Sequence, residues 1–189
     1  MILDIKQLAE SIIDKIKTEV STLGKKPELT IVMVGNNSAS EVYVRNKIKM
    51  CEKVGITGVL RNESEAITEA ALIEIIKELN ADDAVTGILV QSPLPSHIDA
   101  QKVFDVIDPN KDVDGFSNTN ITKLYSGDES GLMPGTPKGV MEIIQSYFSS
   151  KNQCIEKVHT DDSLMSSKIN SDVCTMHYAL CTSTDKNLE

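Results

Sequence analysis

Two short apolar runs, each lying between longer stretches with helical periodicity, most constrain the fold of this chain. Residues 29–34 are rich in β-branched side chains and end at Gly35, and residues 87–90 form a second apolar run. Runs this short are typical of strands that are buried on both faces. Their alternation with helices predicts an α/β fold with a mainly parallel sheet and flanking helices.

The stretches around these runs carry apolar residues at helical spacing. We expect Gly24 to close the first helix, Ser38 or Ser40 to cap the second, and Gly55 to stop it. Thr68 is expected to cap the third helix. The predicted helices are residues 5–23, 38–54, 68–79, 99–107 and 138–148, and the predicted strands are residues 29–34, 56–60 and 87–90.

Glycine and proline divide the chain into two unequal parts. All ten glycines lie between Gly24 and Gly139, and all six prolines lie between Pro27 and Pro137. Beyond them the sequence shows neither a helical stripe nor the turn residues that separate strands. We therefore expect a first domain over residues 1–149, including a linker helix over 134–148, and a separate segment over residues 150–189.

Charge and composition exclude several classes of function. The chain has 19 Lys and Arg against 28 Asp and Glu, a net charge of -9, which disfavours binding to nucleic acid or to an acidic membrane surface. No stretch is long and apolar enough for a signal peptide core or a membrane span. The four cysteines form no C-x-x-C pair, so we expect free thiols and a cytoplasmic protein.

Polar residues follow the predicted strands, where ligands bind in parallel sheets. Tyr43 and Lys47 are four residues apart on a predicted helix, about 40° apart around its axis. Together they could stack a flat substrate and present a proton-transfer group. A solvated lysine beside a tyrosine at the core edge would have the same spacing. Gln91 directly follows a predicted strand and could hold a lysine or a polar ligand, or satisfy loop backbone.

Two carboxylates, Asp112 and Asp114, stand before Gly115. One could pair with Lys111 or cap backbone amides, and the other could accept hydrogen bonds from an amino-pyrimidine edge. A simple Asx-turn is the alternative for either residue. The three histidines show no metal-ligand spacing, so no metal site is predicted.

Four motifs occur in order along the first part of the chain. They read Gly35-Asn-Asn-Ser-Ala-Ser-Glu-Val-Tyr-Val-Arg-Asn-Lys47, Gly87-Ile-Leu-Val-Gln-Ser-Pro-Leu-Pro95, Pro109-Asn-Lys-Asp-Val-Asp-Gly-Phe116 and Pro134-Gly-Thr-Pro-Lys-Gly139. Together they strongly resemble the bifunctional methylenetetrahydrofolate dehydrogenase/methenyltetrahydrofolate cyclohydrolase family, often called FolD. The resemblance covers nearly all of residues 1–148.

The resemblance implies roles for individual residues. Lys47 corresponds to the catalytic lysine, Tyr43 to the tyrosine that stacks on the folate, and Gln91 to the glutamine that hydrogen-bonds the lysine. Asp114 corresponds to the aspartate that binds the pterin, and Val90 and Ser92 fall among the substrate-binding positions. Because a lysine amine titrates near pKa 10.4 in water, proton transfer near neutral pH calls for a partly desolvated, hydrogen-bonded amine.

The sequence also departs from the family pattern. Gly135 stands where the family usually has cysteine. The family's NAD(P)-binding Rossmann domain begins after Ser150, but residues 152–163 contain no glycine for a phosphate loop, and Asp161 and Asp162 would repel a phosphate. Only residues 180–188 resemble the family again. Residues 150–189 are thus expected to be a partial, degenerate Rossmann segment, with no cofactor-binding residue identified.

The resemblance implies a role in one-carbon folate metabolism. The family oxidises 5,10-methylenetetrahydrofolate with NADP or NAD and hydrolyses the methenyl product to 10-formyltetrahydrofolate, as a homodimer. For this chain we expect the dehydrogenase half to be missing. The alternative is a non-enzymatic remnant, a folate-binding or dimerising module without catalysis.

Overall fold

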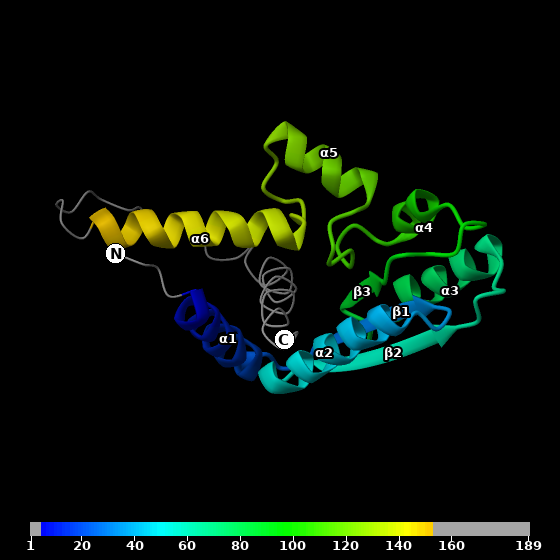
Figure 1. The fold of residues 1–189 in the computed structure, drawn as a ribbon, viewed down its shortest axis with the longest axis horizontal. Helices are drawn as coiled ribbons and strands as arrows, with labels where there is room; N and C mark the ends of the chain where they lie inside the picture. The colour runs from blue at the N-terminus through cyan, green and yellow to red at the C-terminus, as the bar shows by residue number, and fades with distance from the viewer. Residues whose placement is uncertain (1–4, 153–189) are drawn as a thin grey trace.

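The computed structural model describes residues 5–152, and the side chains of residues 5–147. Figure 1 shows helices on both sides of a small sheet and α6 extending away from it. The elements in chain order are α1 (Ile5–Thr22), β1 (Glu28–Val34), α2 (Ser38–Val54), β2 (Thr57–Glu63), α3 (Glu69–Ala81), β3 (Gly87–Val90), α4 (Ala100–Val106), α5 (Asn118–Ser126) and α6 (Gly135–Asn152).

The sheet is parallel with the strand order β2-β1-β3, which confirms the predicted fold class. In register, Leu29 of β1 stands between Gly58 of β2 and Gly87 of β3. An isolated parallel bridge between Ile88 and Asp112 adds a short fourth member beside β3. The sheet thus brings Asp112, far along the chain, next to the central strands.

Alternation along β1 sends its side chains into two separate cores, one on each face of the sheet. The first core contains residues of α1 and α2, and the second contains residues of α3 and α4. The buried members of the first are Ile13, Ile16, Leu29, Ile31, Met33, Val44, Cys51, Val54, Ile56, Leu89 and Val113. Those of the second are Val32, Val34, Leu72, Ile76, Leu79, Val85, Ile88, Val90, Ile98, Val103 and Ile107.

The observed helix ends correct one expectation and confirm two. Asn37, not Ser38 or Ser40, caps α2, because its side chain accepts the hydrogen bond from the Ser40 amide. Gly55 ends α2 with a left-handed φ of 88°, and Thr68 caps α3, as predicted. Three neighbouring residues here can all act as N-caps, so only the backbone geometry distinguishes them.

The helical periodicity of the sequence does not predict α5, and the predicted start of α6 is too late. α5 has good caps, Ser117 before it and Gly127 after it, but the residue it buries is the polar Asn120. An apolar stripe is therefore not what holds this helix in place, and periodicity could not find it. The α6 helix begins at Gly135 rather than Lys138 and runs to Asn152, through the boundary expected near residue 149.

Candidate functional site

Three loops leave the sheet at its carboxyl edge, as the sequence predicted. β1 leads into Gly35 and the cap of α2, β3 leads into Gln91, and the bridge at Asp112 leads into Asp114. Because Asp112 pairs with Ile88 in parallel, Asp114 follows the bridge by the same number of residues as Val90. The register therefore brings the Asp114 turn and the end of β3 to the same edge of the sheet.

Lys47 occupies a core position on α2. The buried residues of this helix are Ser40, Val44, Lys47, Cys51 and Val54, a stripe at helical spacing that faces the sheet. Lys47 is only 5% exposed, although a lysine is seldom buried without partners. An amine in an apolar stripe is thus held there by specific polar contacts, which is a common mark of a functional site.

Gln91 supplies one of those contacts. The Nζ of Lys47 donates a hydrogen bond to the Oε1 of Gln91 at 3.2 Å. The backbone of Gln91 continues the sheet, since its N–H donates to the carbonyl of Val32, and its Nε2 donates to the carbonyl of Ser92. The amide is thus fixed at both ends and presents its oxygen to the lysine, so the strand-end glutamine does hold a lysine.

The other residues around this pair differ in exposure. Tyr43 lies one helical turn before Lys47, but its side chain is 45% exposed, which leaves an aromatic surface open beside the buried amine. Val90 is buried at the end of β3, and Ser92 is exposed and precedes a cis peptide bond to Pro93.

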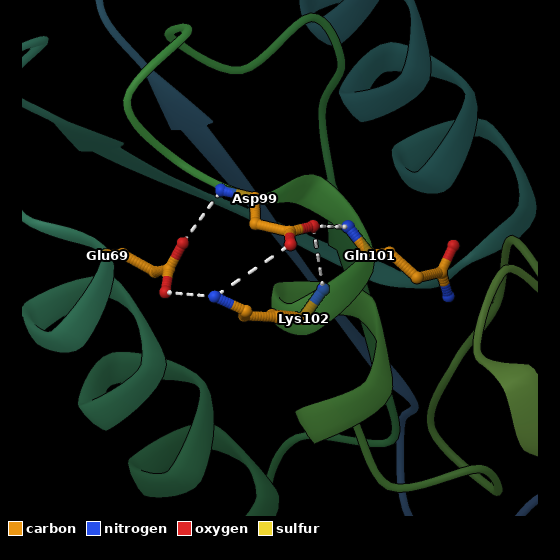
Figure 2. Close-up of polar contacts among 4 residues, drawn as sticks. All are labelled: Glu69, Asp99, Gln101 and Lys102. Carbon is orange, nitrogen blue, oxygen red and sulfur yellow. Dashed lines mark hydrogen bonds and ion pairs between the residues drawn. The ribbon is translucent and has the colours of Figure 1, made fainter.

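The far end of the loop that follows Gln91 makes a hydrogen bond and an ion pair with the start of α3 (Figure 2). The amide of Asp99 donates to the Oε2 of Glu69 at 2.8 Å, and Lys102 lies 3.4 Å from the Oε1 of Glu69. Asp99 itself caps α4 by accepting from the amides of Gln101 and Lys102. A ring nitrogen of His97 contacts the carbonyl of Ile67 at 2.8 Å. These contacts restrain the far end of the Gln91 loop.

The structure separates the two carboxylates of the third motif. Asp112 caps backbone amides, accepting from Phe116 and Ser117, whereas Asp114 is the third residue of a turn closed by the Gly115 amide on the Asp112 carbonyl. Lys111 donates instead to carbonyls at the end of α3. Asp114 is 8% exposed at the edge of the sheet.

Cys51 follows Lys47 by one turn in the buried stripe of α2. Burial raises the pKa of its thiol to about 11, because the apolar surroundings disfavour the thiolate. The group is therefore a neutral core thiol, not a nucleophile.

The rest of the expected site lies outside the described residues. Of residues 150–189, which the sequence predicts to be a degenerate Rossmann segment, those after Asn152 lie outside the described residues. Within residues 5–152, no group of three or more His, Cys, Asp or Glu side chains is placed to hold a metal ion. In the same range, no helix combines the length and apolar character needed to cross a bilayer.

A parallel sheet with polar loops at its carboxyl edge defines a small-molecule-binding domain of the α/β class. Residues 3–114 match the family described as tetrahydrofolate dehydrogenase/cyclohydrolase, catalytic domain, and the chain belongs to this family. The match contains Tyr43, Lys47, Gln91 and Asp114.

Curated relatives that match this chain are named bifunctional protein FolD. The chain is 48% identical over 158 residues to the bifunctional protein FolD of Hydrogenobaculum sp. (strain Y04AAS1), covering 82% of this chain and 57% of that protein. It is 47% identical over 148 residues to the bifunctional protein FolD of Listeria innocua, covering 77% of this chain and 52% of that protein. The chain therefore spans about half the length of the curated relatives it matches.

Solved structures agree with the fold. The FolD methylenetetrahydrofolate dehydrogenase/cyclohydrolase of Campylobacter jejuni superimposes with a TM-score of 0.74 at 41% identity, over 76% of this chain and 52% of that one. The Trypanosoma brucei enzyme, solved with an NADP cofactor and an inhibitor, gives a TM-score of 0.72 at 28% identity, over 78% of this chain and 52% of that one.

Proposed function

We propose that residues 1–149 form a folate-binding catalytic domain that hydrolyses 5,10-methenyltetrahydrofolate to 10-formyltetrahydrofolate. The observation that carries this proposal is the buried amine of Lys47, held by Gln91 at the carboxyl edge of the sheet. Such an amine sits where a parallel sheet binds its ligand and has little other reason to occupy a core position.

Each site residue has a role in the proposal. Lys47 moves protons, Gln91 positions its amine, and Tyr43 stacks its exposed ring on the flat part of the folate. Asp114 accepts two hydrogen bonds from the amino-pyrimidine edge of the pterin, a charge-assisted pairing. Val90 and Ser92 line the substrate beside Gln91.

The hydrolysis needs only the substrate, one water molecule and a group that moves protons. Water adds to the carbon that bridges N5 and N10, the bond from this carbon to N5 breaks, and one proton is released. The amine of Lys47, held at a fixed point by Gln91, accepts a proton from the attacking water and returns it to N5 or to solvent. The reaction needs no hydride acceptor.

The oxidation step is left out of the proposal because the residues do not fit a dinucleotide. NADP or NAD is the cofactor expected for the family, and its phosphates call for a glycine-rich loop. Residues 152–163 contain no glycine and include Asp161 and Asp162. We therefore assign no hydride transfer to this chain and treat residues 150–189 as a segment that no longer serves the cofactor.

The proposal extends to partner and compartment. We expect a homodimer and a cytoplasmic location, supported by the family resemblance and by cysteines that show no disulfide pattern. Sedimentation analysis of the purified chain would measure the mass of the assembly. A monomer at micromolar concentration would contradict the dimer.

Isothermal titration with tetrahydrofolate tests the binding site. We expect Asp114→Ala to weaken binding by about 1–3 kcal/mol, because the pterin donors lose a charged acceptor. Asp83→Ala is the matched control, since Asp83 is exposed and precedes β3 at the opposite edge of the sheet. Equal binding by the wild type and Asp114→Ala would show that Asp114 is not the pterin residue.

Absorbance assays test the chemistry. We expect the wild type to hydrolyse methenyltetrahydrofolate, Lys47→Met to lose this activity, and Lys49→Met, on an exposed position of the same helix, to keep it. Binding without hydrolysis would favour the non-enzymatic module instead. Formation of NADPH from methylenetetrahydrofolate, abolished by Lys47→Met, would overturn the assignment of residues 150–189.

A further inference from the structure

Asp112 lies at the centre of a buried polar cluster beneath the Asp114 turn. Its carboxylate is 1% exposed. Oδ1 accepts from the amide of Phe116 at 3.3 Å, and Oδ2 accepts from the amide of Ser117 at 2.9 Å and from the Nδ2 of Asn120 at 3.0 Å. Three donors directed at one carboxylate offset the cost of burying it, and they fix its orientation.

Asn120 extends this cluster to two further segments. Its side chain is also 1% exposed, and it uses both ends of its amide. Besides Asp112, Nδ2 donates to the carbonyl of Pro109 at 3.0 Å, and Oδ1 accepts from the amide of Leu132 at 3.1 Å. A single buried amide thus joins the start of the Asp114 motif to the segment that precedes α6.

The Asp114 turn lies between Asp112 and the segment around Leu132, which Asn120 binds. On one side, the turn begins at Asp112 and closes when the Gly115 amide donates to the Asp112 carbonyl at 3.1 Å. On the other side, Gly115 packs against the Leu132 segment so tightly that an added Cβ would lie 2.5 Å from the Leu132 carbonyl oxygen. Asp112 makes the first of these contacts itself, and Asn120 fixes the second by accepting from the Leu132 amide.

We infer that Asp112 and Asn120 are positioning residues that orient Asp114 toward the amino-pyrimidine edge of the folate, and so set the selectivity for that edge. The inference rests on the proposed function. Neither residue needs to touch the substrate. Their effect is geometric, because a small displacement of a carboxylate weakens paired hydrogen bonds that depend on direction.

A ligand that lacks one pterin donor separates positioning from general stability. We would titrate each protein with tetrahydrofolate and with 2-desamino-2-methyl-tetrahydrofolate, which has no exocyclic amino group. For the wild type we expect about a tenfold or larger preference for tetrahydrofolate, the usual effect of losing a hydrogen bond to a charged group. Asp114→Ala should abolish this preference.

For Asp112→Asn and Asn120→Ala we expect the preference to fall to about twofold, mainly through weaker binding of tetrahydrofolate. A role limited to stability would lower the folded fraction and weaken both ligands equally. Two variants are used so that the test stands if one fails to fold, which circular dichroism would show. Thr86→Val is the control, because the Thr86 hydroxyl also joins two backbone groups, the amide and the carbonyl of Glu28, but does so at the opposite edge of the sheet.

The outcomes distinguish the two proposals. If folded Asp112→Asn or Asn120→Ala keeps the wild-type preference, the inference is overturned while the proposed function stands. If Thr86→Val loses the preference as well, the effect is not specific to this cluster and the inference is again overturned. If the wild type fails to bind tetrahydrofolate at all, the proposed function fails, and the inference with it.

Discussion

The Nζ of Lys47 and the Oε1 of Gln91 lie 3.2 Å apart, although 44 residues of sequence separate them. One group comes from the buried face of α2 and the other from the first residue after β3. Nothing in either segment alone requires the pair. It forms because α2 packs on one face of the sheet and β3 lies beside β1 in that sheet, so that the end of β3 is close to the buried face of α2.

Replacing Lys47 should make the protein more stable and inactive. Lys47→Met keeps an unbranched side chain of similar length but removes a buried amine, so we expect the free energy of unfolding in urea to rise by about 1 kcal/mol. Lys49→Met, on an exposed position, should change it by less than about 0.5 kcal/mol. A clear loss of stability in Lys47→Met would mean that the Gln91 contact contributes more than burial of the amine costs.

Two glycines with the same backbone conformation should respond differently to alanine. Gly115 has φ +65° and Gly127 has φ +74°, but a Cβ at Gly115 would lie 2.5 Å from the Leu132 carbonyl, whereas nothing lies within 4 Å of one at Gly127. We expect Gly127→Ala to cost about 1 kcal/mol for the backbone alone, and Gly115→Ala about 3 kcal/mol or more. Urea denaturation would measure both, and equal costs would contradict the close approach to Leu132.

Of the residues in Figure 2, we expect Asp99 to contribute more to the stability of the protein than Lys102. Asp99→Ala removes the N-cap of α4, which accepts from two backbone amides, and should cost about 1 kcal/mol. Lys102→Ala removes only ion pairs of an exposed amine with Glu69 and Asp99, and should cost less than about 0.5 kcal/mol. Thermal unfolding of the two variants would rank them, and a larger effect at Lys102 would show that the ion pair dominates.

The stability of the protein should fall at alkaline pH partly because of Cys51. Its pKa is raised from 9.0 to about 11, so between these values the unfolded chain releases the thiol proton while the folded protein keeps it. The stabilisation is complete below pH 9 and is lost as the pH rises toward 11, by up to about 3 kcal/mol.

Cys51→Ala isolates this effect, since every other titrating group is retained. The difference in unfolding free energy between the wild type and Cys51→Ala, measured in urea from pH 8 to pH 11, should shrink as the pH rises. A constant difference over this range would mean that the thiol titrates equally in both states.

Local sequence patterns determined much of what the structure contains. The apolar runs and helical stripes predicted every strand and every helix except α5 within residues 5–152, because burial on a sheet imposes these periods. The order of the motifs indicated the family, position after a strand marked Gln91 as a candidate for a site, and the Asp-Val-Asp-Gly motif marked Asp114. Such signals lie within a few residues of each other, so they can be read directly from the chain.

The tertiary structure decided which of the equivalent residues does what. Asp112 and Asp114 are chemically the same and two residues apart, yet one is enclosed by amides of Phe116, Ser117 and Asn120 while the other stays at the sheet edge. Asn37, Ser38 and Ser40 could all cap α2, and only the path from Gly35 selects Asn37. The role of Asn120 could not be predicted from the sequence, because its partners Pro109, Asp112 and Leu132 come together only after the chain has folded. The sequence determined the elements through local periodicity, but hydrogen-bond partners depend on which distant groups the packed sheet and helices bring together.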